Sequence, residues 1–369
     1  MVPLTQSLAS ESTSVTDGRE AVSNTRRWVY PAVLAVSLLL ASCTSMKTAE
    51  DRALLPYVEN NKIGFIDSTL TTQIHPHFKF ISDSNWPYEF SEGRAAINIL
   101  GRVGYLDQRG KLVIEPAFDA GYSFSEGLAR VTVNGKSGYV DKSGEYRIPP
   151  RFVHAGNFSA GRAPVQLNKD GRWGYINKEG EIVIEPQFLY AGTFNNGLAR
   201  VQTPGHQEWG YINPDGAFVV EPQYPRAHPF SEGLAAVEME FKQFGYIDTL
   251  GRVAIESKFL KAGPFSEGKA AVALPLSADN LDAYKFGYIN RRGTFIVEPS
   301  YDQAFRFKNG IARIKIGDQF GYIDEHGEKI IEPIFDHAWD FRLGLGLVKT
   351  GNKYAYINKK GLFALEPKN

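Results

Sequence analysis

The stretch WGYINKEGEIVIEPQFLYAGTFNNGLARV, residues 173–201, decides the fold because its pattern recurs along the chain. Its core is the tetrapeptide Gly-aromatic-aliphatic-Asp/Asn, and a last copy at residues 355–358 has Ala355 in place of the Gly. Successive copies lie 34 to 42 residues apart, a period typical of repeat proteins. The chain therefore holds about nine copies of one unit of about 35 residues. The complete tetrapeptides begin at Gly64, Gly104, Gly138, Gly174, Gly210, Gly245, Gly287 and Gly321.

Each copy predicts short strands joined by tight turns. After Tyr-Ile-Asn come two polar residues, Gly180 and an aliphatic run, and this order predicts a hairpin because Asn bonds the turn backbone and Gly supplies a positive φ. The Pro that follows, here Pro186, lacks a backbone donor and is expected to end the strand. A second turn, Phe-x-x-Gly at Phe194, leads into a third strand at residues 198–201. The unit is a three-stranded antiparallel meander.

The fold class that follows is all-β. Ordering about 35 residues costs on the order of 50 kcal/mol of conformational entropy, more than one small sheet offsets, so neighbouring units must stack. Repeated aromatic residues such as Phe118, Phe124, Phe188 and Phe194 are then expected in the core between units. Stacking as a propeller-like toroid is the arrangement we favour, and an open β-solenoid or superhelical array is the alternative. If the first strand begins at residue 53 and the last ends at residue 366, the chain holds nine whole units. No split blade, made of strands from both ends of the chain, would then be present to hold a ring closed.

The pattern resembles the WG-repeat family, named for the Trp-Gly that is intact at Trp173-Gly174 and Trp209-Gly210. The resemblance covers about residues 60–366. It implies a repeat scaffold and does not assign a reaction.

The N-terminus indicates export. An apolar run at residues 28–42 follows Arg26 and Arg27, and at about 15 residues it is too short to span a bilayer but matches a secretory signal. The residues before and at Cys43, Leu-Ala-Ser-Cys, resemble the lipobox of bacterial lipoproteins, which implies acylation of Cys43 and cleavage just before it. The segment Thr25-Arg26-Arg27-Trp28 also resembles a twin-arginine signal, although Val29 and Tyr30 depart from it, so both export routes stay open.

Three segments follow from this assignment. Residues 1–42 are a polar extension plus a signal peptide that is removed, residues 43–52 are a lipidated tether, and residues 53–369 are the β domain. We expect an exported protein that is lipid-anchored to a membrane. Thr44 in place of Asp after the cysteine favours, by analogy with lipoproteins, the outer membrane, with the domain facing the periplasm or the cell surface.

Composition excludes several classes of function. Lys plus Arg and Asp plus Glu both number 41, so no global field attracts nucleic acid, and the single Cys allows no intramolecular disulfide. We expect no cofactor, no catalytic residues and no metal site. His75 and His77 could ligate a metal only with a third ligand from elsewhere. Glutamates that recur in nearly every unit, such as Glu126 and Glu185, are expected to serve turns or the surface, because catalysis needs a unique environment.

Two places break the period, and insertions in repeat proteins often carry binding. One is residues 79–89, with Trp86 and Tyr88, and the other is residues 274–285, with Asp279, Asp282 and Tyr284. We expect these as partner-contact loops. The predicted function is a non-enzymatic scaffold in the cell envelope that binds a protein or a glycan. The alternatives are an envelope hydrolase with a site in a central cleft, or a purely structural surface protein.

Overall fold

The structure, a computed structural model, describes residues 53–79, 88–169, 171–205 and 207–368. The chain divides into two compact units, Met1–Met46 and Lys47–Asn369, and every described residue belongs to the second. The described residues form 33 strands and no helix, which confirms the all-β prediction. Accordingly, they contain no helix that could cross a membrane. The predicted signal segment and Cys43 lie outside the described residues.

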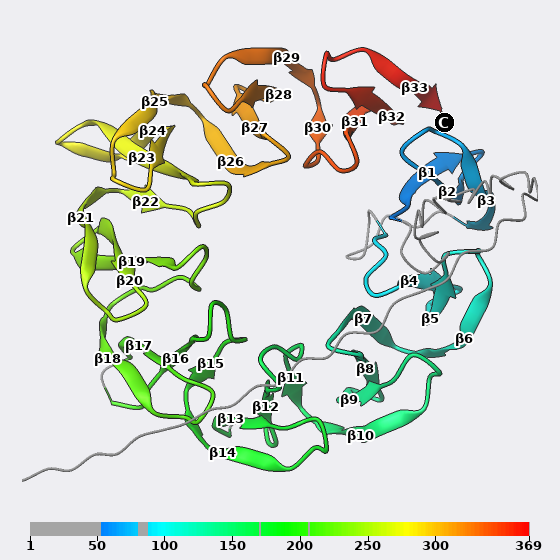
Figure 1. Cartoon of the computed structure of the whole chain (residues 1–369), viewed down its shortest axis with the longest axis horizontal. Helices are drawn as coiled ribbons and strands as arrows, with labels where there is room; N and C mark the ends of the chain where they lie inside the picture. The colour runs from blue at the N-terminus through cyan, green and yellow to red at the C-terminus, as the bar shows by residue number, and fades with distance from the viewer. Residues whose placement is uncertain (1–52, 80–87, 170, 206, 369) are drawn as a thin grey trace, which may run out of the picture. The chain divides into compact units, whose positions relative to one another are not determined.

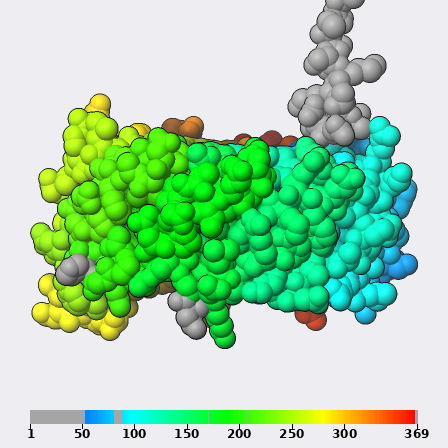
Figure 2. Space-filling view, turned by 90° about the horizontal axis from the view of Figure 1, so that it is seen from below, coloured from blue at the N-terminus to red at the C-terminus, as the bar shows by residue number. Residues whose placement is uncertain are grey.

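In the described part of the chain, the strands form nine antiparallel sheets, each built from consecutive strands. Within the unit Lys47–Asn369 these sheets follow one another around a ring, so the domain is a nine-bladed β-propeller (Figure 1). The wall of successive blades is continuous in the side view (Figure 2). The propeller-like toroid is therefore confirmed, and the open array is wrong. We number the blades 1 to 9 in chain order.

In the residues that the structure describes, every blade contains a second, a third and an outer strand, and six blades add an inner strand on the side that faces the centre of the ring (Figure 1). The inner strands are β7 (Ala120–Ser125), β11 (His154–Ala155), β15 (Tyr190–Ala191), β22 (Lys261–Ala262), β26 (Gln303–Lys308) and β30 (His337–Ala338). The second strands are β1 (Leu55–Glu59), β4 (Arg94–Ile99), β8 (Leu128–Val133), β12 (Ala163–Gln166), β16 (Ala199–Gln202), β19 (Leu234–Glu240), β23 (Lys269–Ser277), β27 (Ile311–Ile316) and β31 (Leu345–Thr350).

The remaining strands complete each blade toward the rim of the ring (Figure 1). The third strands are β2 (Lys62–Ile66), β5 (Arg102–Asp107), β9 (Lys136–Val140), β13 (Trp173–Ile176), β17 (Trp209–Ile212), β20 (Gln243–Asp248), β24 (Asn280–Asn290), β28 (Gln319–Asp324) and β32 (Lys353–Asn358). The outer strands are β3 (Thr72–Lys79), β6 (Leu112–Phe118), β10 (Tyr146–Phe152), β14 (Ile182–Phe188), β18 (Phe218–Tyr224), β21 (Val253–Phe259), β25 (Phe295–Tyr301), β29 (Lys329–Phe335) and β33 (Phe363–Lys368).

The outer strands correct one expectation from the sequence. Pro186 does not end its strand, because β14 runs on to Phe188. Tyr175 pairs with Ile184, and Trp173 pairs with Phe188. The outer strand therefore has more residues between these two pairs than the third strand has, and Pro186 lies in this irregular stretch at the edge of the sheet. Gly174 permits this, because a Cβ there would lie 2.4 Å from the Ile184 carbonyl oxygen. The Gly of the motif thus makes room for the Pro-containing irregularity.

The aromatic residue after this Gly holds neighbouring blades together. Eight buried tyrosines occupy this place in blades 2 to 9. In blades 2 to 8 the hydroxyl donates to a backbone carbonyl 17 residues later, in the next blade, at 2.6 to 2.8 Å. The seven donor and acceptor pairs are Tyr105 and Tyr122, Tyr139 and Gly156, Tyr175 and Gly192, Tyr211 and His228, Tyr246 and Gly263, Tyr288 and Phe305, and Tyr322 and Trp339.

The eighth tyrosine closes the ring. The Tyr356 hydroxyl donates to the carbonyl of Pro56 in blade 1 at 2.8 Å, across 300 positions of sequence. Around it, Leu55 and Tyr57 of blade 1 share a buried cluster with Leu345 and Leu347 of blade 9. Each blade is made from one continuous segment, as the count of whole units predicts, so closure depends on packing between blades 9 and 1. We call this junction the seam.

Candidate functional site

The turns alternate between the two faces of the ring because consecutive strands are antiparallel and all blades share one strand order. The turn face carries the Phe-x-x-Gly turns, which precede the second strands. The aromatic face carries the turns between second and third strands, together with the first residues of the inner strands. The two faces differ in how their side chains are used.

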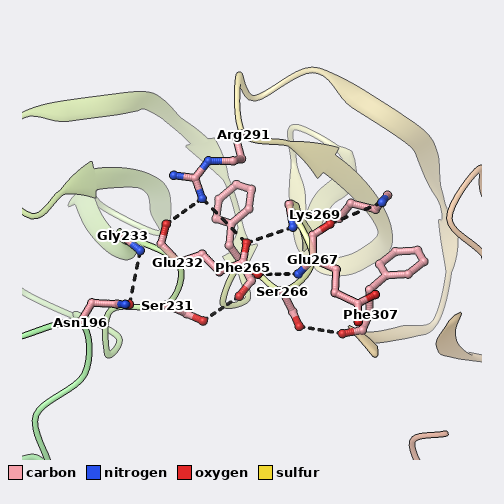
Figure 3. Close-up of polar contacts among 11 residues, drawn as sticks. Asn196, Ser231, Glu232, Gly233, Phe265, Ser266, Glu267, Lys269, Arg291 and Phe307 are labelled. Carbon is pink, nitrogen blue, oxygen red and sulfur yellow. Dashed lines mark hydrogen bonds and ion pairs between the residues drawn. The ribbon is translucent and has the colours of Figure 1, made fainter. Parts of the chain in front are cut away.

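The repeated Ser and Glu of the turn face bond neighbouring blades (Figure 3). Backbone amides of Glu267 and Gly268 donate to the Glu232 carboxylate at 2.6 and 3.0 Å. One blade further, amides of Asn309 and Gly310 donate to the Glu267 carboxylate at 2.6 and 2.8 Å. The same bond joins Glu92 to Gly127 and Glu126 to Gly161. These repeated glutamates therefore serve turns, as predicted, and they also link adjacent blades.

A serine before each of these glutamates adds a second link. The Ser231 hydroxyl donates to the Phe265 carbonyl at 2.7 Å, and Ser266 makes the equivalent bond to Phe307 (Figure 3). Arg291, from a later blade, donates to the Glu232 carbonyl at 2.7 Å. Where the motif is complete, its polar groups are already bonded within the ring, so they are poor candidates for a site.

The aromatic face carries side chains of a different kind. His154 stacks on Trp173 with ring centroids 6.1 Å apart and an angle of 17°, Trp173 lies 6.1 Å from Tyr190, and Tyr190 lies 5.1 Å from Trp209. These four rings are half-buried or exposed, unlike the tyrosines between blades, and the rings that continue the set are so too, except Phe244 and Phe320, which are buried. We call this set the aromatic band. Its members are His154, Trp173, Tyr190, Trp209, His228, Phe244, Tyr284, Phe286, Phe305, Phe320, His337, Trp339 and Tyr354.

Cations lie over the rings of the band. The Arg200 guanidinium is 4.8 Å from the Trp209 ring and 5.2 Å from the Tyr190 ring. Burial, followed by the charge of Arg200, lowers the pKa of His228, and burial likewise lowers that of His337. Burial therefore favours the neutral imidazole in both residues, and Arg and Lys side chains supply permanent positive charge beside the rings. Aromatic residues with Arg are the types that dominate recognition surfaces.

A cavity of about 390 Å³ opens on the aromatic face between blades 6, 7 and 8. Phe244 and Phe286 form apolar walls, and Arg226, His228 and Lys261 supply polar groups. Lys261 also lies 4.5 Å from the centroid of the Tyr284 ring, which joins the cavity to the insertion at residues 274–285.

That insertion lengthens the hairpin of β23 and β24, which places it on the aromatic face. Asp279 lies between the two strands at the tip, and both Asp279 and Asp282 are exposed. Tyr284 is half-buried and packs 5.8 Å from Phe286. The structure therefore brings the predicted residues Asp279, Asp282 and Tyr284 together beside the aromatic band.

The other predicted loop needs a correction. Tyr88 is only 1% exposed and belongs to the core between blades 1 and 2, with Ile63 and Phe65, so it is not a partner contact. The equivalent places in blades 6, 8 and 9 hold His228, Phe305 and Trp339, which are half-buried, so the burial of Tyr88 comes from its packing against blades 1 and 2 and not from its place in the repeat. Trp86 lies outside the described residues. Glu89, next to Tyr88, faces a different cavity.

This second cavity, of about 170 Å³, lies at the seam and was missed in the sequence. Its charged lining residues are Glu89, Arg306, Lys308, Arg313, Asp340 and Arg342. A signal was present: the Ser of the Phe-Ser-Glu-Gly turn is replaced by Lys308 in blade 8 and by Arg342 in blade 9. These two replacements of the turn Ser mark the place in the ring where the charged residues of the cavity lie together.

The two histidines considered as metal ligands lie on β3. His75 is exposed and its carbonyl is 2.7 Å from Nδ1 of His77. Among residues 53–79, 88–169, 171–205 and 207–368, no three metal-ligating side chains form a group.

Comparison with known proteins supports the repeat assignment. The profile of the family described as WG containing repeat matches residues 104–136, 138–169, 173–203, 209–240, 244–274, 286–319 and 320–354. None of the curated proteins compared with the chain matches it.

Among solved structures, one titled as the eukaryotic initiation factor superposes with a TM-score of 0.60 at 11% identity, over 86% of this chain and 96% of that one. Dihydro-heme d1 dehydrogenase NirN gives a TM-score of 0.48 at 12% identity, over 85% and 76%. BamB from Moraxella catarrhalis gives 0.39 at 12% identity, over 75% and 92%. At these identities the first similarity supports the fold alone, and the other two carry no argument.

Proposed function

Because the chain belongs to the WG containing repeat family, a family of repeated β units, we propose that it is a non-enzymatic binding scaffold whose partner docks on the aromatic face of the propeller. The observation that carries this proposal is the contrast between the two faces. On the turn face the repeated Ser and Glu side chains bond neighbouring blades. On the aromatic face, rings and cations remain partly open to solvent and follow one another across several blades.

The chemistry of the aromatic face suits a protein or a glycan as partner. Rings such as Tyr190 offer large apolar surfaces at low entropic cost, and Arg200 and Lys261 add donors beside them. The exposed hairpin of β23 and β24, with Asp279 and Asp282, adds a negatively charged edge. A partner spanning the band and the hairpin would touch residues that differ from blade to blade, which gives specificity.

The scaffold is proposed to act in the cell envelope, held at a membrane through acylated Cys43. This part rests on the signal-like residues 28–42 and the lipobox-like segment that ends at Cys43. Several acyl chains on one residue anchor stably, whereas one chain holds only marginally. The placement that these residues favour is the outer membrane, with the domain facing the periplasm or the cell surface.

Affinity capture tests the docking face. The fragment of residues 44–369 is expected to retain a saturable partner from envelope extract, and Tyr190→Ala is expected to weaken its Kd about tenfold or more, because truncated aromatic anchors cost the most. Tyr146→Ala is the matched control: Tyr146 is 46% exposed on β10, at the rim, and Tyr190 is 36% exposed. Equal capture by both variants, or turnover of envelope substrates without any saturable partner, would contradict the proposal.

The anchor has a separate test. Cells fed a labelled fatty acid are expected to label the full-length protein, and Cys43→Ala is expected to abolish the label and release the protein from membranes. Persisting label in the Cys43→Ala variant would show that the anchor is elsewhere.

A further inference from the structure

On the turn face the repeated polar groups are hydrogen-bonded to neighbouring blades, whereas the cavity at the seam carries an excess of positive charge. It holds four cationic side chains and two carboxylates, which leaves two positive charges uncompensated. Arg342 pairs with Glu89 at 2.8 Å, and Arg306 pairs with Asp340 at 3.4 Å. In the described residues, no carboxylate pairs with the other two cations, Lys308 and Arg313.

Arg313 is held in a fixed position with one donor unused. Its guanidinium lies 3.8 Å from the centroid of the Phe305 ring, and it donates to the Ala338 carbonyl. Its Nε is buried and has no hydrogen-bond partner among the described residues. Burial lowers the pKa of Arg313, and the Asp340 charge opposes that shift, so the charged form is penalised where it stands. The Nε of Arg94 and of Arg130 is buried and unpartnered in the same way, so this atom does not itself mark a ligand. A half-buried cation is costly, however, and an anion bound beside the guanidinium would offset that cost.

The rest of the lining includes apolar side chains. They are Leu55 of blade 1, Leu347 of blade 9 and Trp339. A dry cavity of about 150 Å³ holds a molecule the size of benzene, so a volume of about 170 Å³ admits a short aliphatic or aromatic group. The cavity therefore combines cationic side chains with apolar side chains and has room for a small apolar body.

We infer that the seam cavity binds a carboxylate carried on a short apolar stem, with Lys308 and Arg313 meeting the carboxylate and Leu55, Leu347 and Trp339 meeting the stem. Arg supplies the planar donor edge that fits a carboxylate, and Lys308 adds a point charge. Inorganic phosphate would leave the apolar side chains uncovered and would meet repulsion from Glu89 and Asp340. A free carboxylic acid and an acidic side chain of a partner segment share this chemistry. The inference does not depend on docking at the aromatic face.

Calorimetry on the 44–369 fragment tests the site. Butyrate, as a free acid, and a capped peptide with a single Glu are the two carboxylate probes, and butyramide and inorganic phosphate are the controls. We expect at least one carboxylate probe to bind saturably, and neither control to do so. Lys308→Gln is expected to weaken the Kd about tenfold, because a charge-assisted bond is lost. Lys315→Gln, on the same blade but outside the cavity, should leave the Kd unchanged.

The outcomes separate cleanly. Binding of butyrate alone would identify a small-molecule ligand, and binding of the peptide alone would identify a partner segment, and both support the site. Binding of butyramide as tight as butyrate, preference for phosphate, or equal losses in the two lysine variants would overturn it. So would the absence of binding by both carboxylate probes. A thermal melt of each variant shows that the fold is retained, since neither lysine is in the core.

Discussion

Replacing Tyr356 with Ala is expected to lower the free energy of unfolding by about 3 to 5 kcal/mol, as large-to-small changes of buried aromatic residues do. Tyr356 is 3% exposed, packs against Leu55 and Tyr57 of blade 1, and bonds the Pro56 carbonyl. This loss of stability weakens the seam, where blades 9 and 1 meet without a strand shared between them. A loss of this size is a large fraction of the stability of an ordinary domain.

Urea unfolding of Tyr356→Ala, Tyr356→Phe and Tyr146→Ala measures this effect. Tyr356→Phe keeps the packing and is expected to cost only about 1 kcal/mol for the lost bond, and blade 1 already holds Phe65 at this place in the repeat. Tyr146→Ala, at the exposed rim, should change stability least. If Tyr356→Ala unfolds like the parent protein, closure at the seam does not contribute to stability.

The second large effect is unfolding at high pH. Burial raises the pKa of all eight inter-blade tyrosines well above the ordinary value of 10.0. A raised pKa means that the folded chain keeps protons that the unfolded chain releases, so stability is complete below pH 10.0 and falls as the pH rises above it. One pH unit above that value, each tyrosine contributes a loss of about 1.4 kcal/mol. Together the eight lose on the order of 10 kcal/mol, comparable to the stability of a typical domain.

A pH titration that follows tyrosinate absorbance and tryptophan fluorescence together tests this prediction. The chain has 18 tyrosines, and those open to solvent can ionise without unfolding. We therefore expect the share of the absorbance change that belongs to the eight inter-blade tyrosines to appear only together with the loss of tertiary structure, in one cooperative step above pH 10.0. Ionisation of the eight tyrosines near their ordinary pKa while the fold stays intact would contradict their burial between blades.

Much of the fold could be predicted because each blade is local in sequence. The Asp or Asn of each hairpin accepts the expected turn amides, as Asn213 does from Asp215 and Ala217, and turn glycines such as Gly144 have positive φ. The count of whole units predicted that each blade is one continuous segment, but it did not decide between a closed ring and an open array. The short inner strands were harder to predict, since β11 and β15 have two residues each and their partners lie across a turn.

The candidate sites were less predictable, for physical reasons. The hairpin that carries Asp279, Asp282 and Tyr284 could be located in the sequence because an insertion lengthens the repeat there, and its role as a partner contact stays a prediction. Tyr88 was misjudged because its burial depends on packing against blades 1 and 2, while the residues at the same offset from the turn Phe in blades 6, 8 and 9 are half-buried. The seam cavity joins Glu89 to residues 306–347, and only ring closure brings them together. No local sequence pattern shows that contact. The replacement of the turn Ser by Lys308 and Arg342 was the only sign of the cavity in the sequence.

We propose that residues kept at the same place in nearly every blade hold the blades together, while side chains that differ from blade to blade on the surface and at the seam recognise partners. Measuring the unfolding free energy and the binding constants for Tyr105→Phe, Tyr190→Ala and Lys308→Gln in one experiment tests this most directly, because Tyr105 bonds the next blade and lines neither cavity. We predict that Tyr105→Phe lowers stability and leaves both binding constants unchanged, while Tyr190→Ala and Lys308→Gln each weaken their own ligand and leave stability close to that of the parent. Loss of binding in proportion to loss of stability across all three variants would contradict the claim.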